Sequence, residues 1–128
     1  MSSTETTVLI VDDDEPTQKL LQAVMRRVGL DSAVAPNGRV AIEMLESGGA
    51  FACVILDLMM PSVDGAAVVE HLATRNQPIP VIVCTAVGPL HTPQFDPNVV
   101  RAVVRKPFDV EHLTSAVMEV LKPRRVQP

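Results

Sequence analysis

The stretch VILDLMMPSVDG, residues 54–65, places a carboxylate directly after an apolar run. Val54, Ile55 and Leu56 have the character of a buried strand, and Asp57 follows them at once. A buried carboxylate that lacks a partner either costs several kcal/mol or takes up a proton. We therefore expect Asp57 either at an exposed strand end or beside a partner supplied by another part of the chain.

Strand-like and helix-like segments alternate on both sides of this stretch. Strand-like apolar runs lie at residues 8–11, 32–35, 52–56, 80–84 and 101–104. Apolar residues at helical spacing lie at residues 20–28, 40–45, 65–73 and 110–121. Because the strands are apolar throughout rather than alternating, we expect both of their faces to be covered. The pattern predicts a parallel α/β sheet with helices on both sides.

The segment GPLHTPQFDPN, residues 88–98, interrupts this alternation where a helix is due. It carries Pro89, Pro93 and Pro97, and a proline inside a helix costs about 3 kcal/mol. We expect a short or irregular helix between the fourth and fifth strands.

Length and composition favour one soluble domain. The chain has 128 residues, of which 47% are hydrophobic, but no apolar run approaches the roughly 20 residues that span a bilayer. The N-terminus, MSSTETT, lacks the apolar region of a signal peptide, so we expect a cytoplasmic protein without membrane contact. A net charge of −4 argues against direct binding to nucleic acid. Cys53 and Cys84 lie in apolar runs and are expected to be buried free thiols.

Polar residues recur at the carboxyl ends of the predicted strands. Asp12 and Asp13 end the first, Asp57 the third, Thr85 the fourth and Lys106 the fifth. In open α/β sheets this edge is where ligands bind. Two like charges about 4 Å apart repel by about 4 kcal/mol at an effective dielectric constant of about 20, and a divalent cation relieves this repulsion. Hard oxygen ligands suit Mg²⁺, so the sequence predicts a magnesium site with Asp57 at its rim.

The motifs VLIVDDD, VILDLMMPSVDG, VIVCTA and VVRKPF, in this order and spacing, resemble the receiver domain of two-component response regulators. The resemblance covers about residues 7–121 and leaves short tails at 1–6 and 122–128. It implies a doubly wound, five-stranded parallel sheet of flavodoxin-like order 2-1-3-4-5.

The resemblance also implies a role for each site residue. Asp57 matches the phosphoacceptor, and Asp12 and Asp13 match the acidic pair that binds Mg²⁺ together with Asp57 and the backbone carbonyl of Met59. Asp14 matches no functional position, and we expect a solvated loop carboxylate there.

The phosphate contacts are implied in the same way. Lys106 matches the lysine that contacts phosphoryl oxygens, Thr85 the switch hydroxyl and Ala86 a backbone amide that donates to phosphate. The Lys106–Pro107 bond is similar to one that is usually cis in the family. Met59 and Val87 stand where fast members carry polar side chains that orient a hydrolytic water, which predicts a long-lived phosphoprotein.

The implied function is that of a switch module. The domain takes a phosphoryl group from a sensor histidine kinase or a phosphotransfer protein onto Asp57, and it has at most weak autophosphatase activity rather than enzyme activity on other substrates. One alternative is a pseudo-receiver that has the fold, is not phosphorylated and serves as an interaction module. Another is a magnesium-dependent phosphohydrolase of the haloacid dehalogenase type, whose D-x-D-x-T motif is partly matched by residues 12–16 but without the threonine.

Two departures from the family concern output. Val103 stands where the family usually has an aromatic ring, and the family helix that often forms the output and dimer surface falls on residues 88–98. These departures call dimerisation through that helix into question.

Overall fold

A single parallel sheet forms the centre of the computed structural model, which describes residues 7–48, 50–58, 65–75, 79–86 and 95–122. Its strands are β1 (Thr7–Val11), β2 (Asp31–Ala35), β3 (Cys53–Leu56), β4 (Val81–Thr85) and β5 (Val100–Arg105). They lie in the order β2-β1-β3-β4-β5, and every neighbouring pair is parallel. The predicted five-stranded sheet and its strand order are confirmed.

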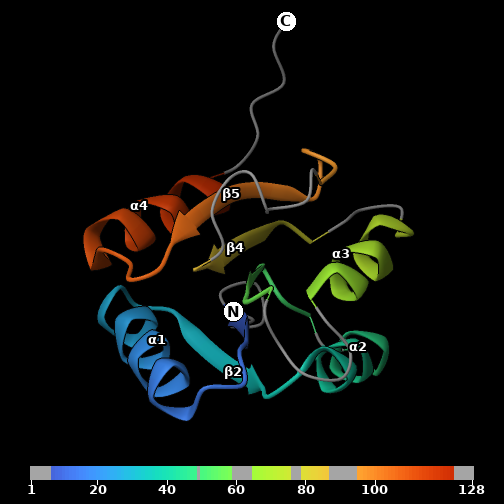
Figure 1. The fold of residues 1–128 in the computed structure, drawn as a ribbon, viewed down its shortest axis with the longest axis horizontal. Helices are drawn as coiled ribbons and strands as arrows, with labels where there is room; N and C mark the ends of the chain where they lie inside the picture. The colour runs from blue at the N-terminus through green and yellow to red at the C-terminus, as the bar shows by residue number, and fades with distance from the viewer. Residues whose placement is uncertain (1–6, 49, 59–64, 76–78, 87–94, 123–128) are drawn as a thin grey trace, which may run out of the picture.

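Helices cover both faces of this sheet. Within the described residues they are α1 (Glu15–Arg27), α2 (Gly38–Glu46), α3 (Gly65–Ala73) and α4 (Val110–Leu121). Helices α1 and α4 lie on one side of the sheet, and α2 and α3 lie on the other (Figure 1). The short or irregular helix was expected over residues 88–98, of which 88–94 lie outside the described residues. Residues 95–98 are described and form no helix: they enter a turn in which the amides of Val99 and Val100 both donate to the Asp96 carbonyl at 2.9 Å.

Short polar side chains begin three of the helices. Asp14, Asn37 and Asp109 are the N-caps of α1, α2 and α4, and each side chain accepts a backbone hydrogen bond from the first turn of its helix. Asp14 is exposed, as expected, but it is a helix cap rather than a loop carboxylate. At the other end of α1, Gly29 has a φ of 84° and ends the helix in a conformation that glycine adopts without steric cost.

Two apolar cores form because successive strand side chains point to opposite faces. In β1, Leu9 and Val11 pack into the core under α2 and α3, whereas Val8 and Ile10 pack into the core under α1 and α4. The helices contribute residues such as Leu45 on the first side and Met25 on the second. Strands β1, β3 and β4 are buried on both faces, as the sequence predicts.

The two outer strands differ from this prediction. β5 alternates between exposed and covered residues, and Val103 is 44% exposed. β2 is fully buried only at Ala35. Within the sheet that the structure describes, each of these strands has a neighbour on one side only, so its residues receive less cover than those of the three central strands.

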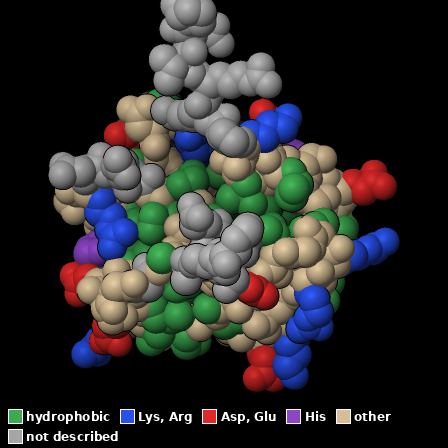
Figure 2. Space-filling model, turned by 180° about the vertical axis from the view of Figure 1, so that it is seen from behind, with side chains coloured by type: hydrophobic (Ala, Val, Ile, Leu, Met, Phe, Trp, Pro, Cys, Tyr) green, Lys and Arg blue, Asp and Glu red, His purple; other side chains and the backbone are tan. Residues whose placement is uncertain are grey.

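The surface combines scattered apolar side chains with charges of both signs. Seen from behind, hydrophobic side chains occupy much of the middle of the face, and acidic and basic side chains lie mostly at its rim (Figure 2). Among the residues that the structure describes, no helix has the length and apolar character needed to cross a bilayer.

Candidate functional site

Backbone hydrogen bonds bring the polar residues that follow the strands to one edge of the sheet. The amide of Asp57 donates to the Val11 carbonyl at 2.9 Å, and the amide of Asp12 donates to the Ala35 carbonyl at 3.2 Å. At the other side of the site, the amide of Lys106 donates to the Thr85 carbonyl at 2.9 Å. These bonds continue the parallel ladders past the strand ends and fix the backbone positions of Asp12, Asp57 and Lys106.

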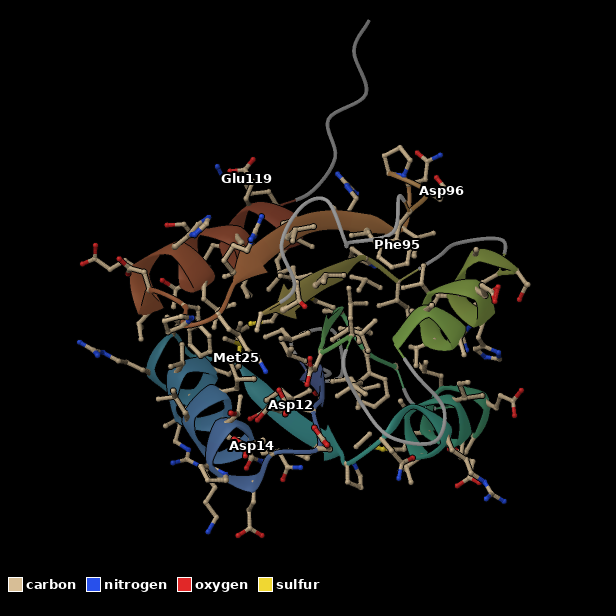
Figure 3. All side chains as sticks on the ribbon, viewed as in Figure 1. Asp12, Asp14, Met25, Phe95, Asp96 and Glu119 are labelled. Carbon is tan, nitrogen blue, oxygen red and sulfur yellow. The ribbon has the colours of Figure 1, made fainter. Side chains whose placement is uncertain are left out.

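Three carboxylates meet at this edge. Asp12, Asp13 and Asp57 each offer an oxygen, and these oxygens all lie within 4.8 Å of one another. Asp12 is 1% exposed and Asp57 is 6% exposed, whereas Asp13 is exposed. Figure 3 shows Asp12 near the end of β1 and Asp14 at the start of α1. Asp57 is therefore buried rather than at an exposed rim, and it has the partner that its burial requires.

That partner is Lys106. Its Nζ lies 3.0 Å from Asp12 Oδ2 and 3.6 Å from Asp57 Oδ2. Burial by itself lowers the pKa of Lys106, but the hydrogen bond to Asp12 and the charges of Asp12 and Asp57 outweigh burial, so the pKa is raised. Lys106 therefore stays charged at neutral pH and compensates two buried carboxylates.

Asp12 is held from several directions. Its Oδ1 accepts a hydrogen bond from the Asp14 amide at 2.9 Å, and its backbone carbonyl accepts one from Gln18 Nε2 at 2.6 Å. Gln18 lies on α1, so the helix and the acidic loop are joined directly. Sequence reasoning missed Gln18 because a glutamine on the first turns of a helix is ordinarily a solvent-facing residue.

Gly65, the first residue of α3, packs against the backbone of Asp57 and Leu58. A Cβ at this position would lie 2.8 Å from the Asp57 carbonyl oxygen and 2.9 Å from the Leu58 Cα. Asp64–Gly65 has the sequence of a turn, but Gly65 is required for this close approach. An Asp-Gly pair in the sequence carries no signal that separates a turn from a close backbone approach.

The remaining predicted site residues are placed as follows. Thr85 is fully buried at the end of β4, and Ala86 next to it is exposed. The Lys106–Pro107 bond is cis, as predicted. Met59 and Val87 lie outside the described residues, so their predicted roles stay predictions.

Among the described residues, the group that could hold a metal ion consists of the three aspartates and includes neither cysteine. Cys53 and Cys84 are free and buried, as predicted. Burial raises the pKa of the Cys53 thiol to about 12 and that of the Cys84 thiol to about 11. Both are therefore protonated and unreactive at neutral pH.

The arrangement suits transfer of an anionic group to a carboxylate. Asp57 offers a buried carboxylate oxygen, and Lys106 places a positive charge beside it. The three clustered carboxylates are hard oxygen donors of the kind that bind Mg²⁺. A nucleophile, a cation and a metal site are the parts that phosphoryl transfer needs.

Comparisons with known proteins show the family of the chain. The family model described as the response regulator receiver domain matches residues 8–118. The transcriptional regulatory protein SrrA of Staphylococcus aureus is 37% identical over 81 residues, which make up 63% of this chain and 33% of SrrA. The chain thus matches about a third of the length of this relative.

Solved structures show the same fold. The receiver domain of the Francisella response regulator 1452 superposes with a TM-score of 0.81 at 24% identity, covering 91% of this chain and 96% of that one. The response regulator TrrA of Thermotoga maritima, in complex with Mg²⁺–BeF, has a TM-score of 0.81 at 26% identity, covering 91% and 99%. Since the family model matches residues 8–118 of 128, the chain belongs to the response regulator receiver domain family.

Proposed function

We propose that this receiver domain accepts a phosphoryl group on Asp57 from a phosphohistidine of a sensor histidine kinase or a phosphotransfer protein, in the presence of Mg²⁺. The observation that carries the proposal is the pairing of a 6% exposed carboxylate with Lys106 beside two further carboxylates. A buried carboxylate is costly unless it is paired with a positive charge. Clusters of buried ionisable groups are frequent at functional sites.

In the proposed step, a carboxylate oxygen of Asp57 forms a bond to phosphorus, and the bond from phosphorus to the histidine nitrogen breaks. The electron pair of that bond stays on the imidazole nitrogen, which can take up a proton from solvent. Lys106 stabilises the negative charge on the phosphoryl oxygens, and the buried Thr85 hydroxyl and the Ala86 amide provide the predicted phosphate contacts.

The residues present fit Mg²⁺. Asp12, Asp13 and Asp57 would hold the ion together with the Met59 carbonyl, and the three carboxylate oxygens lie close enough together to share one ion. When bound, Mg²⁺ neutralises charge on the transferring group. The relative TrrA is described in complex with Mg²⁺–BeF, which supports the same chemistry for this site.

We further propose that the domain signals rather than turning over other substrates. In this proposal the only reaction that the domain catalyses after phosphorylation is the slow hydrolysis of its own phosphoryl group. SrrA is named a transcriptional regulatory protein, but the domain described here has a net charge of −4, and we propose no direct contact with nucleic acid or membrane and a cytoplasmic location.

The test is phosphorylation by acetyl phosphate, with and without Mg²⁺, followed by intact mass spectrometry. Wild type is expected to gain the mass of one phosphoryl group only with Mg²⁺, and Asp57→Asn is expected to gain none. Asp31→Asn makes the same chemical change at an exposed residue of β2 and should be labelled like wild type. Equal labelling of Asp57→Asn and wild type would overturn the assignment, and absence of labelling in wild type would favour an unphosphorylated interaction module.

A further inference from the structure

The two outer strands of the sheet differ in how their free edges are protected. Strand β5 pairs with β4 through a register shift between Val81 and Ile82, and it carries the exposed side chains of Arg101 and Arg105. Bulges and charges of this kind discourage further pairing at an edge. Strand β2 has the sequence DSAVA, and its five described residues pair with β1 one for one and include no basic side chain. β2 is therefore the edge at which a further strand can pair.

The hydrogen bonds to β1 decide which backbone groups of β2 face outward. The Asp12 amide donates to the Ala35 carbonyl at 3.2 Å, so the backbone groups of Ala35 point toward β1. Alternate residues of a parallel strand share this direction. Ala33 therefore also bonds toward β1, whereas Ser32 and Val34 direct their N–H and C=O groups to the free edge. Both of these residues are only half-buried.

Helix α1 leaves space beside this edge. A groove of about 320 Å³ lies between α1 and the start of β2, and it is lined by Gln22, Arg26, Leu30, Asp31 and Ser32. The helix and the strand lie side by side (Figure 1), so the groove separates them at the amino end of β2. A strand added here meets open space rather than a packed helix.

The edge is complementary to a second copy of itself. When two β2 strands lie antiparallel about a twofold axis at Ala33, Ser32 of each copy falls opposite Val34 of the other. Their outward N–H and C=O groups can then exchange backbone hydrogen bonds. The two Ala33 residues face each other in a pair without hydrogen bonds, where antiparallel strands come closest, and a methyl group is small enough to fit there.

Charge complementarity favours the same antiparallel arrangement. Asp31 is exposed at the start of β2, and Arg39, whose side chain is 77% exposed, lies beyond the other end of the strand in the first turn of α2. Antiparallel copies place the acidic end of one strand beside the basic end of the other, whereas parallel copies bring like charges together. Arg39 also lies 3.7 Å from Glu43, but this exposed pair contributes little and leaves Arg39 available.

We propose that two copies of this domain associate through their β2 strands, so that the two sheets join in an antiparallel manner into one. The proposal concerns the edge of the sheet rather than the acidic cluster, and it does not rest on phosphorylation of Asp57. A five-residue strand buries less than the roughly 1,200 Å² of stable complexes, so the dimer is weak and reversible. Its expected dissociation constant is on the order of 100 µM.

The first test is sedimentation equilibrium of the whole chain over a range of concentrations. Ser32→Pro removes an outward N–H, which proline replaces without loss on an edge strand, and should weaken the dimer at least about tenfold. Arg39→Glu places a like charge beside Asp31 of the other copy and should weaken it about fivefold. Arg101→Glu is the matched control, because it makes the same change at an exposed residue of β5, and it should stay within about twofold of wild type.

The second test uses wild type and does not depend on the folding of a variant. Amide hydrogen exchange is followed by NMR at concentrations below and above the dissociation constant. The amides of Ser32 and Val34 should exchange more slowly as the concentration rises, whereas the Ala33 amide, which bonds toward β1, should be protected throughout.

Three outcomes would overturn the proposal. The first is a chain that stays monomeric well above the expected dissociation constant. The second is a dimer that Arg101→Glu disrupts and Arg39→Glu does not, which would place the contact at β5. The third is protection of Ser32 and Val34 that does not change with concentration, which would mean that a segment of the same chain covers this edge.

Discussion

Asp57 shows how a carboxylate is accommodated at the end of a buried strand. Its side chain is 8% exposed, and the Lys106 ammonium lies 3.6 Å from its Oδ2. Lys106 also bonds Asp12, so one ammonium serves two buried carboxylates. Removing one partner of such a group leaves an uncompensated charge, which is more costly than the net contribution of the pair.

Gly65 gives the first prediction, because it holds α3 against the backbone of Asp57. Gly65→Ala places a Cβ within 3 Å of two backbone atoms, so the backbone must shift. We expect a loss of about 1–3 kcal/mol in the free energy of unfolding and slower labelling of Asp57 by acetyl phosphate. Denaturant titration and mass spectrometry measure the two effects.

Gly48→Ala is the control for this prediction. Gly48 has a φ of 90° and open space around its Cβ position, so alanine there strains the backbone far from any contact with Asp57. It should lower stability without slowing the labelling of Asp57. Equal labelling rates in Gly65→Ala and Gly48→Ala would contradict the positioning role of Gly65.

The lifetime of the phosphorylated protein is the second prediction. Met59 and Val87 lie outside the described residues, but a valine side chain has no hydrogen-bonding group and a methionine sulfur is only a weak acceptor for a hydrolytic water. A Met59→Asn, Val87→Glu double variant is expected to lose its phosphoryl group faster than wild type, as followed by intact mass after removal of acetyl phosphate.

The control makes the same two chemical changes at exposed positions. Met118→Asn with Val103→Glu alters side chains that are 46% and 44% exposed, and its rate of phosphate loss should match wild type. A wild type that already loses phosphate as fast as the Met59, Val87 variant would refute the prediction.

Helix α1 connects the acidic loop to the core. Asp14 caps its first turn by accepting from the Thr17 amide and hydroxyl, and Gln18 reaches back to the Asp12 carbonyl. Further along the helix, Leu21 and Met25 are buried in the core shared with α4, and Figure 3 labels Met25 on this helix. Helix α1 therefore contacts the Asp12 backbone through Gln18 and the core through Leu21 and Met25, so a shift of the helix would also move Asp12.

The third prediction is that the contribution of the N-cap Asp14 to the stability of the protein depends on pH. The side-chain and backbone hydrogen bonds from Thr17 lower the pKa of Asp14 below its ordinary value of 3.8. The folded state thus binds a proton on Asp14 less tightly than the unfolded state does. The ionised Asp14 carboxylate therefore adds its full contribution to the free energy of unfolding above the pKa of the unfolded state. This contribution is lost as the pH falls through the pKa of the folded state. Asp14→Ala should therefore destabilise the protein more at pH 7 than near pH 2.5.

Asp14→Asn separates the charge from the cap in this experiment. Asparagine caps helices about as well as aspartate, so this variant should keep much of the stability without the contribution that depends on pH. Denaturant titrations of wild type and both variants across this pH range give the comparison. An Asp14→Ala effect that is the same at both ends of the range would contradict the prediction.

The two cores on either side of the sheet make the domain one cooperative unit. Each central strand contributes side chains to both cores, so neither core can open without disturbing the strands of the other. Cys53 and Cys84 both lie in the core under α1 and α4, on different strands. Their exposure therefore reports opening of that core.

The fourth prediction follows from this placement. With thiol pKa values of about 12 and about 11, neither cysteine should react with Ellman's reagent at pH 8 in the native protein. Both should react at once in denaturant, and the slow native-state rate should rise in step with destabilisation by Gly48→Ala. Reaction of one thiol within the mixing time would show that this core is open locally.

Much of the fold and the candidate site can be predicted from the sequence because both follow from local patterns. Apolar runs that end in polar residues, with helical spacing between them, are enough to place Asp12, Asp57 and Lys106 at one edge of a parallel sheet. The N-cap role of Asp14 could also be found, since an aspartate two residues before a proline is a usual helix start.

Other features depend on packing between distant segments. The burial of Asp57, the reach of Gln18 and the close approach of Gly65 involve distances that no local pattern encodes. The exposure of β5 depends on its place at the edge of the sheet, which the apolar character of its residues does not reveal.

The ion pair between Lys106 and Asp12 joins residues 94 positions apart in the chain. A ribosome makes the acidic loop and Asp57 well before it makes Lys106, so a growing or interrupted chain carries the acids without their lysine. Contacts of such long range form only when the last strand has joined the sheet. An incomplete chain thus has Asp12 and Asp57 but lacks their counter-charge, and the ion pairs with Lys106 exist only in the finished domain.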